Sequence, residues 1–242
     1  MKFGERVNEF GDHLATSISD LLGIMKRNLY STESRWIYRG QADVEWDIVP
    51  SIGRLYKTDN FRDISKLNKF EKDAFSEFLV RTYSEYRTNN KIANLAIAQH
   101  HGLKTRMLDW TFSPLYAIFF AVEDEKHYDK DGVVYAYENK EYNNYNSSTF
   151  DPFKEETYCQ DYYFIFAPSH SPRIKAQLGV FQIFRNPHKE FSRPYNFHRI
   201  TIPKTSKGDI KQELFRLGIS YDLIFPEVDG IASSINYYKL NK

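Results

Sequence analysis

The chain has 242 residues, enough for one large domain or two small ones with a substantial hydrophobic core. Its 33 basic and 32 acidic residues nearly cancel, so the composition provides no strong electrostatic attraction to nucleic acid. The single cysteine, Cys159, excludes an internal disulfide and a multi-cysteine metal site, and we expect no bound metal.

Cellular location is predicted from the same features. No apolar run approaches the roughly 20 residues that a membrane-spanning helix needs, and the N-terminal segment lacks the apolar centre of a signal peptide. A lone cysteine is typical of intracellular proteins. We therefore expect a soluble cytoplasmic protein without membrane contacts. Aromatic residues make up 17% of the chain, which favours stacking on a planar ligand.

The first third of the chain predicts helices around one short strand. Ile18, Leu21 and Met25 repeat at helical spacing, so residues 1–30 are interpreted as an N-terminal helical extension. The β-prone residues 36–38 end in an Arg-Gly-Gln sequence, and residues 46–49 are expected to be extended before a proline. Two amphipathic helices follow, one from Leu67 to Phe78 and onward, the other around residues 92–101.

The central stretch runs from Gln99 to Ala121. Gly102 is expected to end a helix, and the next seven residues, up to Asp109, are interpreted as a polar loop. Ser113 and Pro114 are typical of a helix start, and the apolar helix that follows is predicted to be buried.

The second half predicts mainly strands, at residues 132–138, 162–166, 178–184 and 197–203. Residues 139–159 are expected to form an exposed loop. A late helix around residues 210–217, a last strand at 223–225 and a closing helix at 226–240 complete the chain. The predicted fold is a single α+β domain, with a helical N-terminal half packed on a mostly antiparallel sheet.

Candidate site residues gather first in the central stretch. Polar residues just before a buried helix lie near its positive dipole end, which favours anions. Arg106 and Asp109 are candidates for such a site, or else form a structural ion pair that braces the loop. Of the adjacent His100 and His101, one is expected to cap its helix and the other to donate a hydrogen bond to a ligand.

Other candidates are distant in sequence. Arg39 offers a planar donor fork to a phosphate or carboxylate, and Gly40 allows close approach of a ligand; alternatively, Arg39 forms a strand-end salt bridge before a glycine turn. Gln177 contacts a ligand or lies at a strand edge beside a bulge glycine. Glu227 stabilises a helix start or acts as a catalytic carboxylate.

Four segments resemble the FRG domain family, whose name refers to an aromatic-Arg-Gly tripeptide. They are WIYRGQ, QHHGLKTRMLDWTFSPLYAIFFA, RIKAQLGVFQIF and LGISYDLIFPEVDGIA. Lys104 replaces a usual proline, and FPEVDG replaces FPDLDG. On this resemblance, residues 31–242 are predicted to form an FRG domain.

The order of these motifs is similar to that of ADP-ribosyltransferases, which consume NAD. The resemblance implies that Arg39 holds the NAD pyrophosphate or ribose, and that the Gly40 backbone binds the nicotinamide amide. Gln177 would stand at the third motif, where those enzymes carry a glutamate, so Glu227 or Asp109 would supply the negative charge. The residues implied to bind NAD are Arg39, Gly40, His100, Arg106, Asp109, Trp110, Thr111 and Ser113, with Trp110 or Phe120 lining the nicotinamide pocket. The implied catalytic residues are Arg39, Gln177 and Glu227.

Three functions are therefore considered. The first is an ADP-ribosyltransferase-like enzyme that modifies protein or nucleic acid in phage–host conflict. The second is a non-catalytic nucleotide-binding or signalling module. The third is a nucleic-acid-processing or nucleic-acid-binding protein, against which the near-neutral charge argues.

Overall fold

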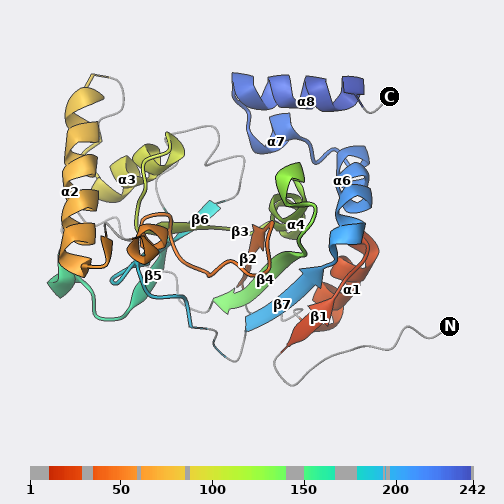
Figure 1. The fold of residues 1–242 in the computed structure, drawn as a ribbon, viewed down its shortest axis with the longest axis horizontal. Helices are drawn as coiled ribbons and strands as arrows, with labels where there is room; N and C mark the ends of the chain where they lie inside the picture. The colour runs from red at the N-terminus through yellow and green to blue at the C-terminus, as the bar shows by residue number, and fades with distance from the viewer. Residues whose placement is uncertain are drawn as a thin grey trace.

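The computed structural model describes residues 11–28, 35–58, 61–84, 88–139, 150–166, 179–192, 194 and 197–240 (Figure 1). The α-helices are α1 (Ile18–Asn28), α2 (Ile64–Arg81), α3 (Lys91–His100), α4 (Pro114–Val122), α6 (Lys207–Arg216), α7 (Tyr221–Ile224) and α8 (Val228–Leu240). The strands are β1 (Asp12–Leu14), β2 (Arg35–Gln41), β3 (Met107–Thr111), β4 (Gly132–Asn139), β5 (Tyr162–Ile165), β6 (Gly179–Phe184) and β7 (Phe197–Ile202).

In the described part of the chain, these strands form one seven-stranded sheet in the order β1-β7-β4-β2-β3-β6-β5. The pairing of β1 with β7 is parallel, and the other pairings are antiparallel. The predicted α+β class and the mostly antiparallel sheet are confirmed. The helices α1 to α4 lie in the first half of the chain, as predicted, but β2 and β3 from the same half form part of the centre of the sheet.

The two faces of the sheet are covered differently. On one face lie α1, α4 and α6 at the β7–β4–β2 side, with α2 and α3 at the β3–β6–β5 side (Figure 1). The other face carries an aromatic cluster of Trp110, Tyr135, Phe164, Phe191 and Phe197. There, irregular chain supplies the cover, including the buried Ile48. Helices and loops thus enclose the sheet from opposite sides.

The approach of α4 to the sheet depends on Gly40. A Cβ atom at this position would lie 1.9 Å from the carbonyl oxygen of Ala117 on α4, and 2.8 Å from the backbone nitrogen of Ala121. Gly132 on β4 faces the same helix, since its Cβ would lie 2.6 Å from the Ala121 carbonyl oxygen. Strand glycines and helix alanines therefore let backbone pack on backbone.

Most helix ends follow the sequence signals. The Ser113 Oγ accepts a hydrogen bond from the Tyr116 backbone N–H at 3.4 Å, with Pro114 at the first helical position of α4. The glycines that end α3 and α6, Gly102 and Gly218, have φ values of 91° and 82°. These predicted boundaries are confirmed.

Three local predictions are wrong. Residues 223–225 do not form a strand, because Tyr221–Ile224 is the short helix α7, which buries Ile224. The stretch up to Asp109 is not all loop, since β3 begins at Met107. The end of the predicted exposed loop is packed, with Phe150 and Tyr158 only 6% and 5% exposed. In each case the local sequence is too short to determine the structure, and tertiary contacts determine it instead.

Residues 11–28 pack on the rest of the described chain. Strand β1 extends the sheet beside β7, and α1 buries Ile18 and Leu21 in the cluster that contains α4 and α6. No helix among the described residues has both the length and the apolar character needed to cross a membrane.

Replacing Gly40 by alanine should destabilise the protein, because the new methyl group meets rigid backbone of α4. We expect a loss of about 1–3 kcal/mol in the free energy of unfolding, measured by chemical denaturation. Gly208→Ala on α6 is the matched control, since the nearest atom to its Cβ is 3.9 Å away. Equal stability of Gly40→Ala and the wild type would contradict the packing argument.

Candidate functional site

A cavity opens at the gap in the sheet where β2 and β3 part, and residues from both faces of the sheet line it. Strand β2 pairs with β4 along all seven of its residues, but with β3 at one position, Tyr38 opposite Thr111. The cavity has a volume of about 310 Å³, at the lower end of the range for small-molecule sites. Its lining includes Arg39, Gln41, Arg54, Gln99, His100 and Asp109.

Arg39 lies between the two parted strands. Its Nη1 donates a hydrogen bond of 2.7 Å to the backbone carbonyl of Asp109. Burial lowers the pKa of the guanidinium to about 10, although the Asp109 carboxylate opposes this shift. A pKa of about 10 keeps Arg39 positively charged at neutral pH. The positive charge of Arg39 therefore lies where β2 and β3 no longer pair with each other.

The end of α3 positions Gln99 and His100. The Gly102 N–H donates to the Gln99 carbonyl at 2.9 Å, and the Leu103 N–H donates to the Ala98 carbonyl at 2.9 Å. This pair of bonds is the Schellman pattern that follows from the left-handed glycine. It fixes the last turn of α3 against the cavity.

A chain of side-chain hydrogen bonds holds the Asp109 carboxylate. Gln99 Nε2 donates to Asp109 Oδ1 at 2.7 Å, and Gln99 Oε1 accepts a hydrogen bond from the Thr105 hydroxyl. Thr105 is fully buried, and its backbone N–H donates to the Ser51 hydroxyl at 3.0 Å. The orientation of Asp109 therefore depends on the amide of Gln99, and that of Gln99 on Thr105.

His100 connects the cavity to the C-terminal helices. Its Nε2 lies 2.7 Å from Oε1 of Glu227, the residue before α8, and its side chain is only 8% exposed. Glu227 itself is not among the cavity-lining residues. Its contact is with the histidine, so Glu227 acts on the cavity through the position of His100.

Two buried polar atoms of the lining residues have no hydrogen-bond partner in the described part of the chain. They are Nε of Arg39, a donor, and Oε1 of Gln41, an acceptor. Gln41 is 3% exposed, and its Nε2 donates weakly to the Asp47 carbonyl at 3.4 Å. An unsatisfied buried polar group costs about 1–3 kcal/mol. A polar ligand in this cavity would offset that cost.

The far end of the cavity is acidic and aromatic. Glu123 and Asp124, just after the last residue of α4, line it together with Phe120 and Trp46. These residues lie at the C-terminal end of α4, so the anion site expected at the N-terminus of this helix stays a prediction. The positive groups of the cavity are Arg39 and Arg54, which lie on β2 and on the 3₁₀ helix η1 (Gly53–Lys57).

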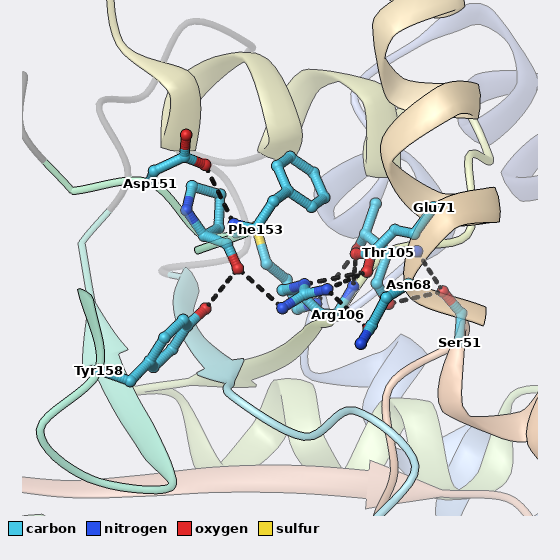
Figure 2. A network of polar contacts seen from close by, with 10 residues as sticks. Ser51, Asn68, Glu71, Thr105, Arg106, Asp151, Phe153 and Tyr158 are labelled. Atoms are coloured by element: carbon cyan, nitrogen blue, oxygen red, sulfur yellow. Dashed lines mark hydrogen bonds and ion pairs between the residues drawn. The ribbon is translucent and has the colours of Figure 1, made fainter. Parts of the chain in front are cut away.

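Arg106 is not among the residues that line the cavity. It belongs to a buried network of polar contacts (Figure 2). Glu71 on α2 accepts three hydrogen bonds from Arg106, from the backbone N–H at 2.7 Å, from Nε at 2.9 Å and from Nη2 at 2.7 Å. Arg106 Nη1 donates to the Pro152 carbonyl at 2.7 Å, and Tyr158 donates to the same oxygen at 3.0 Å.

The proposed pairing of Arg106 with Asp109 is therefore wrong, because the counterion of Arg106 is Glu71. Burial alone would lower the pKa of Arg106, but the Glu71 carboxylate outweighs it and raises that pKa. The two side chains are 4% and 0% exposed. The pair is structural, and it holds α2 and the 150–158 segment against the start of β3.

Comparison with known proteins gives one match. The sequence model of the FRG domain covers residues 34–130. The chain contains an FRG domain. No curated protein and no solved structure is detectably similar to the chain.

The FRG match contains most of the site. It extends from the strand that carries Arg39 to the segment after Asp124, and of the cavity-lining residues only Gly179 and Phe181 lie beyond it. The predicted FRG-domain boundaries of 31–242 remain a prediction. Most of the residues that line the cavity thus lie within the matched FRG segment.

The remaining predicted site residues differ in whether they line the cavity. Thr111 lines the cavity. Trp110 also contributes to the wall, yet its indole packs in the aromatic cluster of the opposite face, where Nε1 donates to Gln182 Oε1 at 2.9 Å. Ser113 caps α4 and does not line the cavity. Gln177 lies outside the described residues, so its predicted role at the third motif stays a prediction.

Sequence reasoning did not single out Gln41 or Arg54. Gln41 is the last residue of the WIYRGQ segment, and its place two residues after Arg39 on one strand indicates a shared face. Arg54 lies in a short 3₁₀ helix with no comparable signal. Among the described residues, no group of three or more His, Cys, Asp or Glu side chains is arranged to hold a metal ion.

Removing the counterion of Arg106 should destabilise the FRG domain strongly. Glu71→Ala leaves a buried, uncompensated guanidinium, and we expect a loss of about 3–5 kcal/mol in the free energy of unfolding. Chemical denaturation measures this loss. The double variant Glu71→Leu with Arg106→Met removes both charges and should recover much of it. A double variant as unstable as Glu71→Ala would contradict the ion-pair explanation.

Proposed function

We propose that the FRG domain binds NAD⁺ in this cavity, and that the protein is an ADP-ribosyltransferase-like enzyme that transfers ADP-ribose to a protein or nucleic-acid acceptor. The observation that carries the proposal is the pair of unsatisfied buried atoms, Arg39 Nε and Gln41 Oε1, on residues that line one cavity. Native proteins rarely leave such atoms without a partner, so a ligand with both acceptors and donors is expected there.

Arg39 supports binding of a phosphate group. Its Nη1 is engaged by the Asp109 carbonyl, while Nε remains without a partner in the described chain. A guanidinium binds phosphate through parallel N–H donors, and it is the residue best suited to this geometry. Arg39 would therefore hold the pyrophosphate of the dinucleotide.

The distribution of charge supports an oxidised pyridine dinucleotide. Such a ligand carries an anionic pyrophosphate and a cationic nicotinamide ring. The two arginines of the cavity interact with Asp109, whereas Glu123 and Asp124 belong to a different lining segment, just after α4. Trp46 and Phe120 offer aromatic surface near the acidic residues, where a cationic ring would be favoured. The lining is acidic overall, so a simple polyanion such as nucleic acid is disfavoured.

The proposed reaction breaks the bond between the ribose C1′ and the nicotinamide nitrogen. Nicotinamide leaves with the bonding electron pair as a neutral molecule, and a nucleophile of the acceptor forms the new bond to C1′ and loses its proton. Positive charge develops on the ribose, and the carboxylate of Asp109, which lines the cavity, would stabilise it. Glu227, predicted as catalytic, would be a positioning residue that acts through His100.

A second function, a nucleotide-binding module without turnover, is favoured by one observation. The Asp109 carboxylate accepts a hydrogen bond from Gln99 and lies in the field of Arg39 and Arg54, which attenuates its charge. A carboxylate held in this way is less able to stabilise a cationic ribose. Binding of NAD⁺ without release of nicotinamide would select this function.

Arg39→Ala should weaken NAD⁺ binding by about tenfold or more, because a charged hydrogen bond contributes about 1.5–3 kcal/mol. Isothermal titration calorimetry measures this affinity. Arg81→Ala is the control, since Arg81 lies on α2 in an exposed ion pair with Glu77. Absence of NAD⁺ binding by the wild-type protein, or equal binding by Arg39→Ala, would overturn the proposal.

Asp109→Asn separates binding from chemistry. The amide keeps the size of the side chain but removes the negative charge, so we expect nicotinamide release to fall by about 10²–10³ while NAD⁺ affinity changes little. Chromatography of released nicotinamide, with labelled NAD⁺ and a cell lysate as the source of acceptor, measures turnover. Full activity of Asp109→Asn would exclude this carboxylate as the stabilising group.

A further inference from the structure

Arg54 is a second cation at the cavity, and no role has been assigned to it so far. It lines the cavity together with Arg39, and it is the more exposed and only partly buried residue of the two. Among the described residues, no hydrogen bond or ion pair engages its guanidinium. The Asp109 carboxylate interacts with both arginines electrostatically, and the two arginines repel each other. Two cations thus share one nearby anion in this part of the cavity.

The backbone that carries Arg54 is anchored firmly. The Ile52 N–H donates to the Thr105 carbonyl at 3.2 Å, and the Thr105 N–H donates to the Ser51 hydroxyl at 3.0 Å. At Gly53, a Cβ atom would lie 1.8 Å from the Pro187 carbonyl oxygen, so the chain packs closely on its other side as well. An arginine on such a support, with no hydrogen bond or ion pair within the described residues, is well placed to bind a ligand.

This anchoring connects Arg54 to the site residues already described. Thr105 orients Gln99, and Gln99 binds the Asp109 carboxylate that lies near both arginines. The position of Arg54 relative to Arg39 is therefore set by the same buried threonine. Both pKa values are lowered by burial, so each guanidinium would gain from an added anion.

We propose that Arg39 and Arg54 together form a diphosphate site, in which Arg39 binds one phosphate group inside the cavity and Arg54 binds the adjacent group at the more exposed wall. Two arginines facing one carboxylate leave one positive charge in excess, and a bridging diphosphate compensates both cations at once. The site then selects nucleoside diphosphates and dinucleotides over monophosphates and nucleosides. This inference rests on the proposed nucleotide binding.

Calorimetric titration of the full chain with adenosine, AMP, ADP, ADP-ribose, NAD⁺ and inorganic pyrophosphate tests the inference. We expect the wild type to bind ADP-ribose and NAD⁺ at least about tenfold tighter than AMP. Pyrophosphate alone shows whether the two phosphate groups suffice or the nucleoside is also needed. Arg54→Ala should weaken the diphosphate ligands about tenfold and AMP about twofold or less, which removes the preference.

Arg54→Lys and Arg81→Ala serve as controls. The lysine keeps the charge but not the planar fork, so it should retain part of the preference, and Arg81→Ala should retain all of it. If Arg54→Ala weakens adenosine, AMP and ADP equally, Arg54 only supports the fold of the cavity and the inference is overturned. If NAD⁺ binding depends on Arg39 but not on Arg54, the inference fails while the proposed function stands. If no nucleotide binds the wild type, both fail.

Discussion

The buried ion pair of Arg106 and Glu71 is the constraint on which the site depends. Taking two charges out of water is costly unless each finds good hydrogen bonds. Here the carboxylate accepts from the backbone and side chain of Arg106, and the guanidinium also reaches Pro152 and Asn68 (Figure 2). Three segments far apart in sequence, α2, the start of β3 and the segment around Pro152, are thereby fixed to one another.

The residue before this pair extends the constraint into the cavity. Thr105 is fully buried, contacts Ser51 and Ile52 through its backbone, and orients Gln99 through its hydroxyl. Residues 99–109 therefore have two structural roles. Thr105 and Arg106 hold the surrounding segments, while Gln99, His100 and Asp109 line the cavity. The QHHGLKTRMLDW segment therefore contains both residues that support the site and residues that form its wall.

Local signals determined what could be predicted from the sequence. Gly102, the Ser113-Pro114 pair and the β-rich runs of β4 to β7 each encode their structure within a few residues, and those elements were predicted. The counterion of Arg106 could not be predicted, because Glu71 lies 35 residues earlier, on helix α2. Strand β3 was missed because five residues that include a charged Asp109 resemble a loop. Arg54 was missed because only tertiary packing brings it to the cavity.

Adjacent residues of β2 serve the hydrophobic core and the charged cavity of the FRG domain separately. Gly40 lets α4 pack backbone to backbone on β2, and the neighbouring Arg39 then occupies the space where β2 and β3 no longer pair. A bulkier residue at position 40 would push α4 away and move Phe120, Glu123 and Asp124 with it. The glycine therefore sets the width of the cavity through helix packing, while the arginine beside it supplies the charge. The adjacency of an arginine and a glycine in this strand thus has two separate physical causes, one in the core and one in the site.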